Sequence, residues 1–205
     1  MSALPLRADA ARNRRRLLDA AVRVFTEKGL DAGVDEIARE AGLGVGTLYR
    51  RFPTKEDLVG AVLEDRVEGM VAALEAAAAE DDPWAALEQA LQAIGEAVVF
   101  QHAALHDIKR SGGHAPLIRA GRERILALLG AIIARGQAAG VVRDDLAAVD
   151  ALALSGMLAR LPAWQLEQDP GIWRRYLGLM LDGLRPEAAR PLPQPPTRAE
   201  PPFMR

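Results

Sequence analysis

The sequence predicts an all-α protein. Runs that alternate apolar and polar residues, which would indicate strands, are almost absent, and long Ala- and Leu-rich stretches repeat their apolar residues at helical spacing. Glycines and prolines interrupt these stretches where helices usually end or begin. The chain has 205 residues, half of them hydrophobic, which is enough for one sizeable domain or two small ones with a true core.

The expected helices follow from this punctuation. Gly29 and Gly42 occupy positions typical of helix C-caps, and Asp144 or Asp145 is expected to cap the helix that follows. Four prolines stand at or just before expected helix starts: Pro53, Pro83, Pro116 and Pro170. We therefore predict about nine helices, at residues 9–28, 34–41, 45–51, 55–80, 83–102, 103–110, 115–139, 147–168 and 170–184.

Composition excludes several classes of site. There is no cysteine, so disulfides, thiolate zinc sites and a cysteine nucleophile are all absent. The N-terminus carries Arg7 and Asp9 where a signal peptide needs an apolar run. The longest apolar run, 125–134, is half of the roughly 20 residues that span a bilayer. We expect a soluble cytoplasmic, nucleoid-associated protein with no membrane partner.

The net charge of −2 does not by itself favour nucleic acid, but the cations are clustered. Residues 1–60 hold 11 Lys/Arg and 9 Asp/Glu, with arginines concentrated at 12–16 and 50–51. The cluster at 12–16 fits either a DNA-contacting arm or a solvated start of a helix.

The stretch 41–58, "AGLGVGTLYRRFPTKEDL", holds three glycines in five residues. A dinucleotide fingerprint would need a preceding strand and a third glycine where Thr47 stands, and a phosphate loop would need a Gly-Lys pair. Neither requirement is met. The preceding residues instead place Val34, Ile37, Ala38 and Ala41 on one helix face.

A helix-turn-helix explains this stretch better. Apolar residues also recur at helical spacing on the next segment, at Val45, Leu48, Tyr49 and Phe52, and only 42–44 separate the two. The residues left facing outward are small or cationic, which suits a helix lying in the major groove: Gly46, Thr47, Arg50 and Arg51. The two arginines alone would equally suit a plain helix C-terminus.

In combination, "AAVRVFTEKG", "IAREAG", "GTLYRRF" and K-x-x-L resemble the DNA-binding unit of the TetR family of bacterial transcriptional regulators, over about residues 12–62. The resemblance implies a helix-turn-helix at Gly33 to Phe52. It also implies phosphate contacts from Tyr49 and Lys55 and base contacts from Thr47, Arg50 and Arg51. The full set of implied DNA-binding residues is Gly44, Val45, Gly46, Thr47, Tyr49, Arg50, Arg51 and Lys55. Many relatives carry Ser or Thr at Gly33 and Ser at Gly44, so two possible phosphate contacts are missing here.

The resemblance also implies two domains: an N-terminal arm and DNA-binding domain at 1–54, and an effector-binding and dimerisation domain at 55–184. Composition predicts a third region, a Pro-rich, disordered tail at 185–205. The fourth helix places Leu63, Val67, Met70, Val71 and Leu74 on one side. The tail holds 7 of the 13 prolines.

Candidate residues in the second domain are less specific, because core packing would also explain them. The candidate effector-pocket residues are Trp84, Phe100, His102, His106 and Trp164. The candidate dimer-interface residues are Leu152, Ser155, Gly156, Ala159, Trp173, Tyr176 and Leu177, for which packing within one protomer is the alternative.

The sequence therefore indicates a homodimeric, ligand-responsive repressor on a near-palindromic operator. Its partners would be double-stranded DNA, a second copy and a small apolar or amphipathic effector; no cofactor, metal or catalytic residue is expected. One alternative is an enzyme or metal-binding protein that uses His102, His106 and Asp107, although a metal site needs further ligands. The other is an architectural DNA binder or an activator with the same head.

Overall fold

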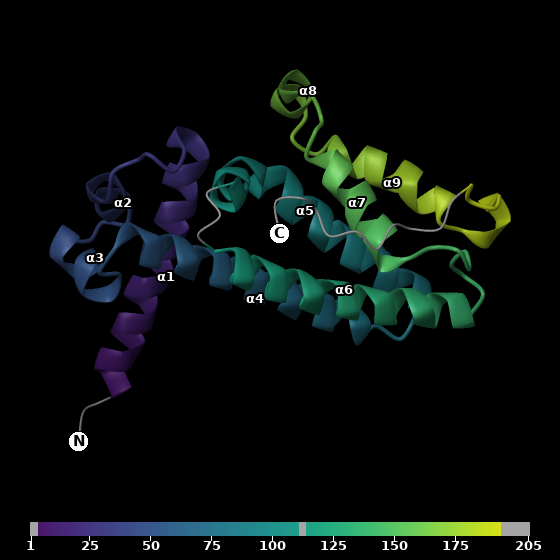
Figure 1. The fold of residues 1–205 in the computed structure, drawn as a ribbon, viewed down its shortest axis with the longest axis horizontal. Coiled ribbons are helices and arrows are strands. Elements are labelled where there is room, and N and C mark those ends of the chain that lie inside the picture. Colours follow the sequence, from purple (N-terminus) through teal and green to yellow (C-terminus); the bar gives the residue numbers. More distant parts are fainter. Residues whose placement is uncertain (1–3, 111–113, 194–205) are drawn as a thin grey trace. The chain divides into compact units, whose positions relative to one another are not determined.

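The computed structural model describes residues 4–110 and 114–193, with side chains described for 9–99, 114–187 and 189–193. The described residues form helices and connecting turns without a strand, so the all-α prediction is confirmed (Figure 1). The elements are α1 (Leu4–Lys28), α2 (Val34–Glu40), α3 (Val45–Arg51), α4 (Lys55–Ala78), α5 (Pro83–Arg110), α6 (Ala115–Ala138), α7 (Ala148–Leu158), α8 (Ala163–Gln168), α9 (Trp173–Gly183) and the 3-10 turn η1 (Pro186–Ala188).

Two predicted helix divisions are wrong. Helix α5 runs without a break through residues 102 and 103, where no glycine or proline interrupts it. The predicted helix at 147–168 is instead two helices, because α7 ends at Leu158 and Pro162 is the N-cap of α8. A proline inside a helix removes a backbone hydrogen bond and clashes with the preceding turn, which explains the second break.

The described contacts divide the chain into two compact units. The first, here called the head, consists of Met1–Arg66 and Ala103–Ile118, and the C-terminal unit consists of Val67–His102 and Arg119–Arg205. Helices α4, α5 and α6 each contribute residues to both units. The functional boundaries predicted at 54/55 and 184/185 remain predictions.

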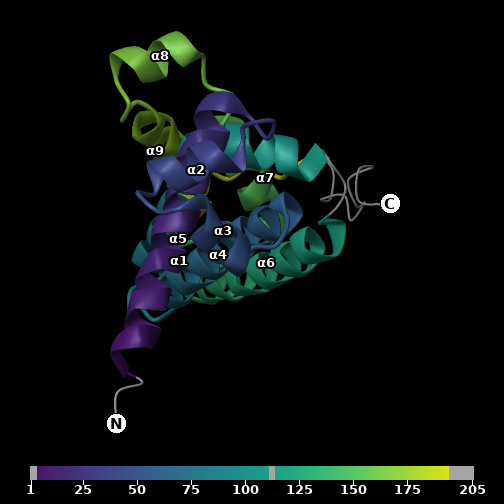
Figure 2. The ribbon, with the colours of Figure 1, turned by 90° about the vertical axis from the view of Figure 1, so that its left-hand side faces the viewer.

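The head is built around a small apolar core to which α1 to α4 all contribute. Its fully buried members include Leu17, Leu18, Phe25, Ile37, Leu48 and Leu58. Leu117 and Ile118, in the first turn of α6, pack against the same core. In two perpendicular views, α2 and α3 lie beside the C-terminal part of α1, and the first turns of α1 extend past them (Figures 1 and 2). Packing into this core, chiefly through Leu48, therefore fixes α3 on the head.

The C-terminal unit has its own core, which contains Leu74, Leu87, Ile94, Leu129, Ile133 and Trp173. Two helix pairs approach closely at glycines: a Cβ at Gly121 would lie 2.7 Å from Val67, and one at Gly95 would lie 2.8 Å from Trp173. Arg124 also forms a two-point ion pair with Glu68, at 2.5 and 3.2 Å, which lowers the pKa of that carboxyl. These contacts fix α4 against α6 and α5 against α9.

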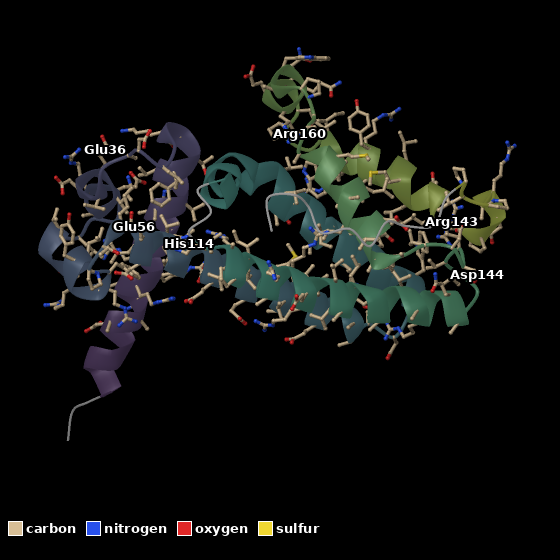
Figure 3. All side chains as sticks on the ribbon, in the orientation of Figure 1. Glu36, Glu56, His114, Arg143, Asp144 and Arg160 are labelled. Atoms are coloured by element: carbon tan, nitrogen blue, oxygen red, sulfur yellow. The ribbon has the colours of Figure 1, made fainter. Side chains whose placement is uncertain are left out.

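The segment that follows α9 is bonded to the connector between α6 and α7. Arg143 donates to both carboxylate oxygens of Asp145 (2.6 and 3.1 Å) and to the carbonyl oxygens of Gly183 (3.2 Å) and Arg190 (2.7 Å). The backbone N–H of Leu192 donates to Asp145 Oδ2 at 3.1 Å. Arg143 and its neighbour Asp144 are labelled in Figure 3. Residues 185–193 of the predicted tail thus contact the folded unit.

The hydrogen bond from Arg143 lowers the pKa of Asp145 to about 2, although burial acts in the opposite direction. The expected helix cap at Asp144 or Asp145 is wrong. Instead, the Asp150 carboxylate accepts a hydrogen bond from the Ala147 N–H, which lies just before α7, at 3.0 Å. Asp145 is therefore free to hold the C-terminal segment.

Candidate nucleic-acid interface

The turn between α2 and α3 is a Schellman motif. From the sequence, Gly42 was predicted only to cap the C-terminal end of α2. Gly42 has a φ of 64°, its N–H donates to the Arg39 carbonyl at 3.0 Å, and the Leu43 N–H donates to the Ala38 carbonyl at 2.9 Å. Leu43 packs against the head core, which completes the motif. Arg16 Nη2 donates to the Gly42 carbonyl at 3.4 Å and so ties α1 to this turn.

Helix α3 begins without a side-chain cap. Gly44 is its N-cap, in an extended conformation, and its carbonyl accepts from the Thr47 N–H at 2.9 Å. Gly33 precedes α2 in the same way, also without a side-chain hydrogen bond. A Cβ at either glycine would meet nothing within 4 Å, so the missing hydroxyls are not excluded by space.

The two faces of α3 differ sharply. Leu48 and Phe52 are buried in the head core and Val45 packs against it, as the helical stripe predicted. Tyr49 does not follow that stripe: its side chain is 47% exposed, because it lies at the edge of the buried face. That part of the stripe prediction is corrected, and the exposed side chain of Tyr49 is available to a partner.

The outer face of α3 is small and positively charged. Gly46, Arg50 and Arg51 are exposed and Thr47 is half-buried. Within the described part of the chain, neither arginine has a hydrogen-bond or ion-pair partner. Several other cations of the head do form ion pairs, such as Arg23 with Glu40 at 2.8 Å and Lys28 with Glu36 at 3.0 Å. The uncompensated charge is thus directed at solvent on the helix that follows the turn.

Lys55 is placed by a capping box at the start of α4. The Asp57 carboxylate accepts from the Thr54 N–H at 3.0 Å, and the Asp57 N–H donates back to Thr54 Oγ1 at 3.0 Å. Lys55 is the first residue of this helix, and no side-chain partner is present among the described residues. The T-x-x-D spacing is a signal for this cap that the sequence analysis did not use.

His114 supports the same turn from a distant part of the sequence. Its Nε2 lies 3.2 Å from the Glu56 carbonyl oxygen, and a Cβ at Gly60 would lie 3.1 Å from the same nitrogen (Figure 3). The residue just before α6 therefore contacts the first turn of α4, next to Lys55. Nothing in the local pattern indicates this contact, since 58 residues separate the two positions.

The outer face of α3 carries positive charge without partners among the described residues. A helix of this kind in a helix-turn-helix suits the major groove of DNA and the phosphates that border it. Comparisons with known proteins agree. Residues 17–62 match the model of bacterial regulatory proteins of the tetR family, and residues 82–186 match the C-terminal domain of SbtR-like transcriptional regulators. A TetR transcription regulatory protein from Mycobacterium vanbaalenii is 35% identical with a TM-score of 0.68, over 88% of this chain and 99% of that one. The chain belongs to the TetR family.

Further relatives agree with this assignment. The TetR transcriptional regulator SCO0520 from Streptomyces coelicolor is 34% identical with a TM-score of 0.67, covering 84% of this chain and 98% of its own. A Staphylococcus aureus HTH-type transcriptional regulator is 42% identical over 60 residues, which are 29% of this chain. The matched stretch spans only about a third (32%) of that curated relative. The protein is thus a DNA-binding transcriptional regulator with a TetR-type helix-turn-helix, and members of the TetR family are regulators, not enzymes.

The effector candidates of this TetR-family regulator are only partly described. Trp84 is half-buried, and the guanidinium of Arg185 lies over its ring at 3.7 Å from the centroid. Trp164, on α8, is 58% exposed, so in one protomer it faces solvent and does not line a closed pocket. The side chains of Phe100, His102 and His106 lie outside the described residues, as does that of Asp107.

The dimer candidates fall into two groups. Ser155, Trp173 and Leu177 are buried in the core of the protomer itself, which agrees with the alternative of packing within one protomer; their role in a dimer stays a prediction. Leu152, Gly156, Ala159 and Tyr176 are half-buried and stay available. Large exposed apolar side chains that the sequence analysis did not select stand on the same helices: Met157 at 64% and Leu179 at 61%.

The described residues hold no group of three side chains suited to a metal ion. No helix among them is long and apolar enough to cross a membrane.

Proposed function

We propose that this TetR-family regulator is a ligand-responsive repressor that binds a near-palindromic operator as a homodimer. The observation that carries the proposal is the outer face of α3, where Arg50 and Arg51 have no partner among the described residues. An exposed cation costs little free energy in water, so one such arginine would carry no information. Two neighbouring arginines without partners, next to the exposed Tyr49 on a recognition helix, are complementary to a groove lined by phosphates.

Exposed apolar side chains on α7, α8 and α9 support the dimer. Met157, Trp164 and Leu179 are each more than half exposed, which is unusual for large apolar residues in one region. A second copy related by a two-fold axis would cover them with the same surface. It would also present two heads to two half-sites about one helical turn apart.

The effector part of the proposal rests on the C-terminal unit. Ser155 is the only polar residue in its described buried core, so a ligand bound among these helices would be mainly apolar or amphipathic. Three helices, α4, α5 and α6, contribute to both units. An effector that favours one arrangement of these helices would thereby change the affinity of the heads for DNA.

Selection from a random-sequence duplex library, followed by footprinting, tests the DNA part. We expect recovered sites with two-fold symmetry and half-sites about 10 base pairs apart. Protection of many sites without symmetry would favour an architectural binder instead. Reporter expression in a deletion strain then separates the two signs of regulation: expression should rise if the protein represses and fall if it activates.

A thermal-shift screen of fatty acids, steroids and aromatic amphiphiles tests the effector part. Compounds that raise the melting temperature are then added to the complex with the selected duplex. Release of the duplex is the expected result. Binding that stabilises the protein but leaves its affinity for the duplex unchanged would contradict ligand-responsive repression.

A further inference from the structure

The first turns of α1 extend beyond the core of the head. The helix begins at Leu4. Among its residues with described side chains, which start at Asp9, the first buried one is Leu17, and residues 9–12 are all exposed. Both perpendicular views show this part of α1 reaching past α2 and α3 (Figures 1 and 2). The segment Leu4–Arg16, here called the overhang, is about 20 Å long at about 1.5 Å per residue. None of residues 9–16 is buried, so packing inside the head core does not account for this described part of it.

Arg14 continues the core-facing stripe of α1 into the overhang. It precedes the buried residues Leu17, Leu18 and Ala21 by three, four and seven positions, which places all four on one helix face. Arg14 is half-buried, and among the described residues its guanidinium has neither a hydrogen bond nor an ion pair. The face that is apolar inside the head therefore becomes cationic where the head ends.

The other arginines at 9–16, where side chains are described, have partners within the protein. Arg12 pairs with Asp9. Arg15 pairs with Asp19 at 3.1 Å and with Asp65 at 3.4 Å. These exposed pairs restrain the side chains but contribute little to stability.

The bond from Arg16 to the Gly42 carbonyl locates the overhang relative to α3. Gly42 stands in the turn that leads directly into α3, so α1 passes beside the N-terminal end of that helix. In helix-turn-helix proteins this end of the recognition helix enters the major groove. The overhang then continues from a point close to the phosphates that border the groove.

Charge identifies the occupant of this face. Residues 9–19 carry four arginines and two aspartates, whereas the whole chain has a net charge of −2. The partner that suits this cationic face is a polyanion, and the DNA proposed to bind Arg50 and Arg51 of the same unit is one. At about 3.4 Å per base pair, the overhang spans about six base pairs of a duplex.

We propose that the overhang is a second DNA contact, in which Arg14 pairs with phosphates flanking the half-site that α3 reads. The contact adds affinity without base specificity, because phosphates are alike in every sequence. It rests on the proposed function, since it requires that α3 engages DNA.

Two duplexes that carry the selected operator test the proposal. The short one ends two base pairs outside each half-site, and the long one extends ten base pairs further on both sides. We expect wild-type protein to bind the long duplex about three- to tenfold more tightly, as two additional exposed ion pairs per dimer would give. Arg14→Gln should abolish this difference, leave affinity for the short duplex within twofold, and lower the salt dependence on the long duplex only.

Matched variants separate charge from structure. Arg14→Lys keeps the charge and should retain the preference for the long duplex. Arg122→Ala removes a half-buried arginine of α6 that has no partner in the described part of the chain, and it should behave as wild type. The melting temperature of each variant verifies the fold.

Two results would overturn the proposal: equal wild-type affinity for both duplexes, or an Arg14→Gln loss that is the same on both. Failure of wild-type protein to select any duplex would instead remove the proposed function, so the two failures can be told apart.

Discussion

Replacing Gly46 by alanine should stabilise the protein and weaken its binding to DNA. Gly46 is the second residue of α3, it is exposed, and a Cβ there would meet nothing within 4 Å. Alanine is favoured over glycine in helices by about 0.5–1 kcal/mol, mainly because glycine loses more backbone freedom on folding. For a chain of this length, that gain corresponds to a rise in melting temperature of about 1–4 °C.

The same methyl group would stand between the backbone of α3 and the floor of the major groove. If Gly46 allows close approach, the helix has to withdraw and lose base contacts, and we expect at least a tenfold loss of operator affinity, about 1.4 kcal/mol. The two effects have opposite signs, so a general folding defect cannot imitate them. Thermal unfolding by circular dichroism and fluorescence anisotropy with the selected duplex measure them separately.

Gly69 provides the matched control. It is exposed in the middle of α4, and a Cβ there also meets nothing within 4 Å. Gly69→Ala should raise the melting temperature by a similar amount and leave DNA affinity unchanged. If Gly46→Ala binds the duplex as tightly as wild type does, Gly46 does not face the groove and the assigned orientation of α3 is wrong.

Three further predictions concern charge and hydrogen bonding. Arg50→Ala should lower operator affinity by about 1–3 kcal/mol if the arginine reads a base, and Tyr49→Phe should lower it less. If both variants bind the operator as wild type does, α3 is not the recognition helix. Lys55→Ala should lower affinity equally for all duplex sequences and reduce the slope of log affinity against log salt by about 1. Asp145→Asn should lower the melting temperature at pH 7. Because Arg143 holds the pKa of Asp145 at about 2, below its ordinary 3.8, the carboxylate stabilises the fold above pH 4 and loses this effect as pH falls towards 2. The difference between wild type and variant in thermal melts should therefore shrink at pH 3, and a constant difference would contradict the ion pair.

Local sequence patterns were enough to predict structure where the conformation or burial of a residue depends on its neighbours in sequence. The turn at Gly42 and the buried face of α3 follow from glycine and apolar spacing, because both depend on contacts within a few residues. Tyr49 did not follow, since a residue at the border of a stripe is buried or exposed according to what packs beside it. The helix predictions from periodicity were also wrong at two places. They split α5, which has no break, and they merged α7 and α8, which are separated at a proline.

Long-range contacts were beyond the sequence pattern. His114 holds the first turn of α4 from 58 residues away, and neither partner has a local signal for the other. Trp173 looked like a contact residue for a second copy because it is large and apolar on a late helix. It is instead 0% exposed in the protomer core, where Gly95 leaves room for its ring. Burial of this kind depends on how helices pack, which periodicity alone does not determine.

The bonds made by Arg143 bear on where this protein can be shortened. Composition suggests a cut after residue 184, where the proline-rich stretch begins. Such a cut would remove the Arg190 carbonyl and the Leu192 N–H, leaving Arg143, only 11% exposed, with one fewer acceptor and Asp145 with one fewer donor. A truncation after Pro193 keeps every one of these bonds. A shortened version that keeps these bonds therefore extends nine residues beyond Leu184, the buried C-cap residue of α9. A protease cut or a fused tag placed before that point would loosen the C-terminal unit.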